Sequence, residues 1–291
     1  MNSSFETPGH VQVFVENAVG LVAIATSEGT STEVTLEADS PGAQELVDRS
    51  TVECRPSGGR DVVRVKIPHR HGPKFTRRNG VTVRVTMPVA GDVDVSTASA
   101  DVELSGSMGN VSVKTASGDL SGDQSAGEVR AKTASGDLFV GDVGGALHLH
   151  SASGDLRANR VDGRAAMTTA SGDIEIGAAG DGIEVRCTSG DVRLGDVNGD
   201  ASIVGVSGNI RVASCGGGRM QIRAVSGDVT VGIAKGVSLT VDVETMSGRV
   251  HSEIPLGDSL VPGDDGAAVV VNARTVSGDV LIERAVGASV G

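Results

Sequence analysis

The sequence predicts an all-β chain folded as a single-chain β-solenoid, or β-helix, with coils of about 18 residues, two short strands in each coil and capped ends. Two observations carry this prediction: a tripeptide that recurs at a fixed interval, and an alternation of apolar and polar residues between its copies. Composition adds a third, because the 291 residues include 42 Gly, four Phe and no Trp or Tyr. The interior must therefore be filled by aliphatic side chains.

The recurring tripeptide is Ser-Gly-Asp or a close variant. Its copies begin at Ser99, Ser117, Ser135, Ser153, Ser171, Ser189, Ser207, Ser226, Ser247 and Ser277. The first six intervals are 18 residues, and the last three are 19, 21 and 30. An interval kept over so many copies indicates a stack of equivalent units, and the longer late intervals indicate insertions in loops near one end.

Alternation within the unit indicates its backbone. Each Asp is followed by an apolar, a variable and an apolar residue, as in Leu138–Val140, and after a Gly-rich turn a second alternating run follows, as in Leu147–Ser151. A period of two is that of a strand. The left-handed hexapeptide helix also has 18-residue coils but needs an apolar residue at every sixth position. Counting from Leu138 gives Gly144 and His150, so the coil of two strands is favoured.

Three regions follow from this pattern. Residues 1–90 lack the strict repeat but alternate like strands, with a short helix expected within 41–49, and they are expected to form an irregular β-rich cap. Residues 91–246 are expected to form the regular solenoid. Residues 247–291 are expected to form degenerate coils whose final unit, at Ser277, caps the other end. Caps are needed because an open coil end exposes unpaired backbone groups.

The run TASGDL at Thr115 and Thr133, its variants at Ser151 and Thr169, and the lead-in VTVRVTMPVAGDVDVSTAS resemble the putative-adhesin family of bacterial β-strand-repeat proteins of unknown function. The resemblance extends from about Val81 to Ile282. It implies a repeat architecture and an adhesin-like binding role, but it implies no particular ligand. A second, weaker similarity is to bactofilin-like cytoskeletal solenoids, which polymerise end to end.

Charge and composition exclude several classes of partner. Lys and Arg total 25 against 37 Asp and Glu, a formal charge of -12, which repels nucleic acid and anionic lipid. Three widely spaced cysteines without ligand spacing predict no metal-thiolate site, and no cofactor is expected. The apolar runs are far shorter than a membrane span and the amino terminus does not have the pattern of a signal peptide, so we expect no membrane span and a cytoplasmic protein.

The regular spacing of the motif aligns its acidic residues in one column. We interpret these side chains as turn formers that accept backbone N–H groups, because Asn209 replaces Asp once. The alternative is a ladder of Ca²⁺ sites, since stacked carboxylates suit that ion. The residues of this candidate cation ladder are Asp119, Asp137, Asp155, Asp173 and Asp191.

Two groups of basic residues form a candidate partner surface. Arg157, Arg193 and Arg211 occupy one outward position of nearby coils, where they form either a basic stripe for an acidic partner or a solvated face of mixed charge. The segment HRHGPKFTRRN is the strongest departure from the acidic average, and it is either a docking loop or a solvated connection. Its candidate residues are His69, Arg70, His71, Phe75, Arg77 and Arg78.

No catalytic motif is present: the sequence has no GxSxG elbow, P-loop, HExxH or dinucleotide fingerprint. We therefore expect a non-enzymatic structural or interaction protein, an adhesin-like scaffold that binds a protein partner or associates with itself. The alternative is a ligand- or polysaccharide-acting β-helix enzyme that uses the exposed Arg and Asp face. End-to-end polymerisation is a third hypothesis.

Overall fold

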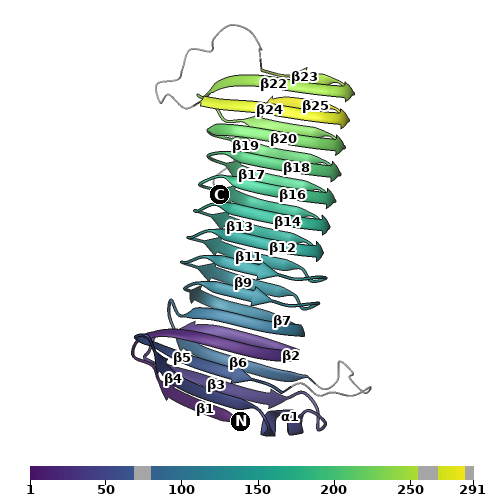
Figure 1. Cartoon of the computed structure of the whole chain (residues 1–291). Coiled ribbons are helices and arrows are strands. Elements are labelled where there is room, and N and C mark those ends of the chain that lie inside the picture. The colour runs from purple at the N-terminus through teal and green to yellow at the C-terminus, as the bar shows by residue number, and fades with distance from the viewer. Residues whose placement is uncertain (69–79, 255–267, 286–291) are drawn as a thin grey trace. The chain divides into compact units, whose positions relative to one another are not determined.

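The computed structural model describes residues 1–68, 80–254 and 268–285 (Figure 1). The chain forms two compact units, Met1–Gly145 and Ala146–Gly291. Nearly all of the described secondary structure is β-strand, and parallel strands stack coil upon coil in each unit, so the predicted β-solenoid is confirmed. The described residues contain no helix long and apolar enough to cross a membrane.

The first unit opens with a mixture of antiparallel and parallel strands. Its elements are β1 (Asn2–Glu6), β2 (His10–Ser27), β3 (Ser31–Ala38), α1 (Gln44–Asp48), β4 (Thr51–Ser57), β5 (Arg60–Lys66) and β6 (Val81–Pro88). The pairs β1–β3, β3–β6 and β4–β5 are antiparallel. The short helix expected within 41–49 is α1.

Strand β2 forms the first coil. One edge pairs in parallel with β5 and then β6, and the other edge pairs along most of its length with β7 (Asp92–Met108). At Gly20, where φ is 123°, an added Cβ would strike the backbone of Val81, so only glycine fits this bend. Parallel stacking thus starts inside residues 1–90.

The rest of the first unit repeats the coil that the sequence predicts. Strand β7 spans a whole coil, because its first half pairs with β8 (Val111–Lys114) and its second half with β9 (Leu120–Ser125). Strands β10 (Val129–Lys132) and β11 (Leu138–Val143) then stack in parallel on β8 and β9. Partners in these last two pairs are 18 residues apart, as Leu138 and Leu120 are.

The second unit is built from two parallel ladders, one for each strand of the coil. The first contains β12 (Leu147–Ser153), β14 (Ala165–Ser171), β16 (Ile183–Ser189), β18 (Ala201–Ser207), β20 (Gly218–Ser226), β22 (Ser238–Ser247) and β24 (Ala268–Ser277). The second contains β13 (Leu156–Val161), β15 (Ile174–Ala179), β17 (Val192–Val197), β19 (Ile210–Cys215), β21 (Val229–Ile233), β23 (Val250–Ser252) and β25 (Val280–Arg284).

The coils of the second unit do not stack in sequence order. Strand β20 pairs with β24, and β24 pairs with β22, while β21, β25 and β23 follow the same order. The last coil in the sequence therefore lies between two earlier ones, as the yellow strands of Figure 1 show. The prediction that the unit at Ser277 forms the end was wrong. The periodic pattern cannot reveal this order, because every coil offers equivalent edges, and the 30-residue interval from Ser247 to Ser277 allows the chain to step back.

The interior of the second unit is a stack of aliphatic side chains. Leu156, Ile174, Val192, Ile210, Val229 and Val280 form one inward column, and none is more than 2% exposed. Smaller side chains fill the corner, with Ser151, Thr169, Cys187, Ala224 and Thr275 all buried. In the terminal coil, inward Leu239, Val241 and Val243 are only partly buried.

Close stacking requires glycine at the motif corner of both units, and the backbone conformation adds a second requirement in the second unit. In the second unit Gly172 and Gly190 both have φ of 141°, as a left-handed turn requires. In the first unit Gly118 and Gly136 do not have a positive φ. An added Cβ there would strike a carbonyl oxygen of the preceding coil, that of Ala100 or Gly118, as it also would at Gly172 and Gly190. Close stacking alone explains glycine at those two corners.

Candidate interaction surface

The acidic column forms a chain of hydrogen bonds from coil to coil. In the second unit the backbone N–H of Asp173 donates to Asp155 Oδ1 at 2.9 Å, and that of Asp191 donates to Asp173 Oδ1 at 2.8 Å. The first unit has the same bond from Asp137 to Asp119, at 2.9 Å. Each carboxylate thus satisfies a backbone donor of the next corner.

Asn209 forms the same hydrogen bonds as the aspartates of this column. Asn209 donates its N–H to Asp191 Oδ1 at 2.9 Å, and its own Oδ1 accepts the N–H of Asp228 at 3.0 Å. The position therefore needs an oxygen acceptor rather than a charge. The described residues hold no group of three His, Cys, Asp or Glu placed to bind a metal ion. The candidate cation ladder remains a prediction, which calorimetric titration with Ca²⁺ would test.

The predicted arginine stripe lies outward on β13, β17 and β19, beside the acidic column. Arg157 contacts Asp155 at 2.6 Å and Glu175 at 3.7 Å. Arg193 contacts Asp173 at 2.9 Å and Asp191 at 2.7 Å. Arg211 reaches Glu283 at 3.4 Å. The structure thus brings these arginines together with acids of the same face, which offset their charge.

The pKa of Asp173 is relevant to the alternative hypothesis of a polysaccharide-acting enzyme that uses the exposed Arg and Asp face. The backbone N–H of Asp191 lowers the pKa of Asp173, and the Arg193 side chain lowers it further. A site that cleaves glycosides needs one carboxyl group kept protonated by a raised pKa. The pKa of Asp173, which lies near Arg193 and Arg157, shifts in the opposite direction. The geometry therefore gives the alternative no support at this place.

The three cysteines are also poor candidates for chemistry. Burial raises the pKa of the Cys187 and Cys215 thiols, and burial together with Asp61 raises that of Cys54. The reactive species of cysteine is the thiolate. Raised pKa values keep all three in the unreactive thiol form.

A polar cluster that sequence reasoning missed lies in the first unit. Asp92, 9% exposed, accepts from His10 Nε2 at 2.9 Å through Oδ2 and from the backbone N–H of Asn110 at 2.8 Å through Oδ1. Arg60 lies 3.5 Å away. Burial would raise the pKa of Asp92, but the bonds from His10 and Asn110 outweigh it and lower the pKa. The cluster joins β2, β5 and β7, and its members are too far apart in sequence to form a motif.

The basic segment interpreted as either a docking loop or a solvated connection lies at residues 69–79. His69, Arg70, His71, Phe75, Arg77 and Arg78 fall outside the described residues. Their role remains a prediction.

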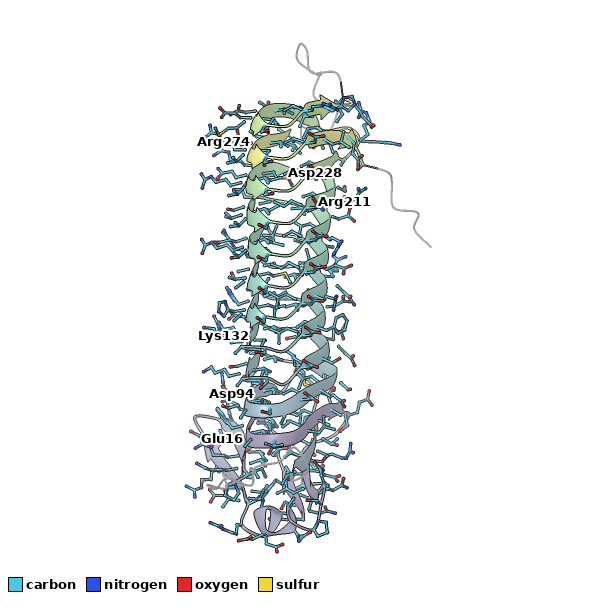
Figure 2. All side chains as sticks on the ribbon, turned by 90° about the vertical axis from the view of Figure 1, so that its right-hand side faces the viewer. Glu16, Asp94, Lys132, Arg211, Asp228 and Arg274 are labelled. Atoms are coloured by element: carbon cyan, nitrogen blue, oxygen red, sulfur yellow. The ribbon has the colours of Figure 1, made fainter. Side chains whose placement is uncertain are left out.

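A second feature missed in the sequence is a groove of about 420 Å³ on the outward face of β20, β24 and β22. We call it the arginine groove; its polar lining is Arg219, Gln221, Arg223, Asp242, Asn272 and Arg274. Arg223 lies in register with Arg274, and Gln221 with Asn272. Figure 2 shows Arg274 on the opposite side of the coils from Arg211 and Asp228.

The charges of the arginine groove are only partly offset. Arg274 contacts Glu244 at 3.6 Å. Arg219 and Arg223 have no ion-pair partner among the described residues. The groove could not be found in the sequence, because it exists only through the placement of β24 beside β20.

An exposed apolar column lies next to this groove. Val206, Val225, Val276 and Met246 occupy the same outward position, just before the motif serine, and are 40%, 48%, 45% and 81% exposed. Val225 lies two residues beyond Arg223 and so faces the same side of β20. The second unit thus presents basic and apolar side chains in adjoining columns.

Two overlapping stretches, residues 21–183 and 178–283, match the family model Toastrack DUF4097. The chain belongs to this family. The two matches together span most of the described solenoid, so the family relation covers both compact units.

Solved structures similar to this Toastrack DUF4097 chain have low identity to it. One is named a putative adhesin from Bacteroides fragilis, with 12% identity, a TM-score of 0.35, and coverage of 97% of this chain and 96% of that chain. Another is named a putative lipid binding protein from Parabacteroides distasonis, with 12% identity, a TM-score of 0.38, and coverage of 97% and 96%. A comparison with curated proteins gave no match.

Proposed function

We propose that this chain is a non-enzymatic interaction scaffold whose coils display outward side chains to a protein partner. The apolar column carries the proposal. Val225, Val276 and Met246 are large apolar residues on adjacent strands, and each is at least 45% exposed. A contiguous exposed apolar strip beside charged residues is typical of a protein-binding surface.

The repeated positions support a scaffold rather than a catalyst. The acidic column satisfies backbone donors, and Arg157 and Arg193 contact acids of their own face. The most regular polar groups therefore stabilise the coils. Residue identity varies between coils at the outward positions. Such variation can create a specific surface without disturbing the core.

The test compares two triple variants of the full chain. The first, Val225→Ser with Val276→Ser and Met246→Ser, removes the three most exposed side chains of the apolar column. The control, Ala152→Ser with Ala170→Ser and Thr188→Ser, changes the same corner position in coils where the side chains are small. Both sets lie at exposed positions, so circular dichroism should show an unchanged fold.

Each chain is immobilised, and proteins retained from extracts of the source cell are quantified, while sedimentation velocity measures self-association. We expect the first variant to lose at least one retained protein by tenfold or more, and the control to keep it. A shift of the wild type to dimers that the first variant abolishes would assign the column to a second copy. Identical retention and sedimentation for all three chains would contradict the proposal.

A further inference from the structure

We propose that the arginine groove binds an extended, carboxylate-rich segment of the protein partner. This inference rests on the proposed function, because it names the chemistry of the partner at a surface adjoining the apolar column. It concerns Arg219, Arg223 and Arg274, which lie on the side of the coils opposite the predicted stripe, as Arg274 and Arg211 show in Figure 2.

The groove collects basic residues although the chain as a whole carries -12. Three arginines line it, against a single acid, Asp242, among its described lining residues. Arg223 and Arg274 lie on neighbouring parallel strands, which are about 4.8 Å apart. Like charges so placed repel each other, and of these two side chains only that of Arg274 has an acidic contact within the described part of the chain, with exposed Glu244. A carboxylate between Arg223 and Arg274 would relieve this repulsion and accept hydrogen bonds from both guanidinium groups.

The arginines on the two faces of the second unit differ in their contacts. Arg157 and Arg193 each contact two acids there. The guanidinium groups of Arg219 and Arg223 form no ion pair with any described residue, although the backbone N–H of Arg219 donates to Asp200 Oδ1 at 2.9 Å. The same residue type is thus internally paired on one face and left open to an external anion on the other.

The spacing of the arginines along β20 favours an extended segment. Arg219 and Arg223 are four residues apart on β20, which places them about 13 Å apart on one face. An extended peptide along β20 repeats its own side chains on one face every ~7 Å, so two carboxylates four residues apart match both arginines. Gln221 lies between Arg219 and Arg223 on β20, and Asn272 is its partner on β24. Their side-chain amides can form hydrogen bonds with the backbone of the bound segment.

The lining also selects the class of ligand. None of the described residues that line the groove is aromatic, so they offer bases and sugar rings no stacking surface. Val225 follows Arg223 by two residues and is 48% exposed, so an apolar residue of the partner can contact it once the acids are bound. Both features favour a protein segment over nucleic acid or polysaccharide.

The experiment measures binding of a fluorescein-labelled hexaglutamate peptide to the full chain by anisotropy in 50 mM salt. The test variant is Arg219→Gln with Arg223→Gln. The matched control is Arg157→Gln with Arg193→Gln, which removes the same charge from the same unit. All four side chains are exposed, and melting curves will show whether each variant is folded. If the double variant melts early, Arg223→Gln alone replaces it.

We expect the groove variant to weaken hexaglutamate binding by tenfold or more, and the control to change it by less than twofold. Hexaglutamine should not bind. Equal binding by both variants, or equal binding of hexaglutamine, would overturn the proposal. Displacement of the peptide by inorganic phosphate at equal concentration, or by an equal amount of short single-stranded DNA, would overturn the assignment to carboxylates of a protein.

The two proposals fail separately. Loss of the retained partner in the apolar-column variant, without hexaglutamate binding to the wild type, would remove the groove assignment and leave the scaffold function standing. The opposite result is hexaglutamate binding that depends on Arg219 and Arg223, while the apolar-column variant retains every protein that the wild type retains. It would contradict the scaffold proposal at the apolar column and leave the anion site in the arginine groove supported.

Discussion

Oδ1 of Asp173 accepts the backbone N–H of Asp191, one coil further along, at 2.8 Å. The bond joins equivalent corners of neighbouring coils, where the chain turns between its two strands. Since Asp191 offers its own Oδ1 to Asn209 at 2.9 Å, the bonds form a continuous line along the column. This line explains why the motif keeps an acceptor at one position while the outward residue two places later varies.

The acceptor can be tested at Asn209, which has no ion pair to complicate the result. Asn209→Ala removes the acceptor of the Asp228 N–H, and we expect a loss of about 1 kcal/mol in the free energy of unfolding. Asn209→Asp keeps the oxygen and should stay within about 0.5 kcal/mol of the wild type. Urea unfolding followed by circular dichroism measures both. Equal losses in the two variants would show that the hydrogen bond is not what the position requires.

Close stacking at the corner predicts a large effect for Gly190→Ala. Its φ is 141°, and an added Cβ would strike the carbonyl oxygen of Gly172, so we expect a destabilisation of roughly 2 kcal/mol or more. Gly217→Ala is the control, because a Cβ there meets nothing within 4 Å. Its thermal unfolding temperature should change little. Similar midpoints for the two alanine variants would refute this account of the corner.

The lowered pKa of Asp92 predicts how the stability of the fold depends on pH. Its folded-state pKa is lowered, so its stabilisation is complete above the unfolded value of about 3.9 and is lost as the pH falls through the folded-state value. Asp92→Asn keeps an oxygen for the Asn110 N–H but loses the charge facing His10 and Arg60. The variant should be less stable than the wild type at pH 5, and the difference should shrink at pH 3. Unfolding midpoints at both pH values measure it, and a constant difference would contradict the assignment.

Local sequence was sufficient to predict the coil. Alternation fixes which side chains face inward, and the 18-residue interval places Ile174 over Leu156 and under Val192, as the register shows. The acceptor role of the acidic column also followed from the sequence, because Asn209 indicated that charge was dispensable.

Long-range order was beyond the same reasoning. The edges of all coils are chemically alike, so the pattern could not show that Arg274 lies between Arg223 and Glu244. The arginine groove depends on that order. The cluster of His10, Arg60 and Asp92 was missed for a related reason, since β2 pairs with strands more than 40 residues away.

The placement of β24 between β20 and β22 is the basis of the interaction surface, and disulfide crosslinking tests it directly. Three double variants are oxidised: Gln221→Cys with Asn272→Cys, Asn272→Cys with Asp242→Cys, and Gln221→Cys with Asp242→Cys. The first two pairs are in register on adjacent strands, about 4.8 Å apart, whereas the third spans two strand spacings and exceeds the reach of a disulfide. Peptide mapping should find crosslinks in the first two variants and none in the third. A crosslink between positions 221 and 242, with position 272 unreacted toward both, would contradict the stacking order and the surface built on it.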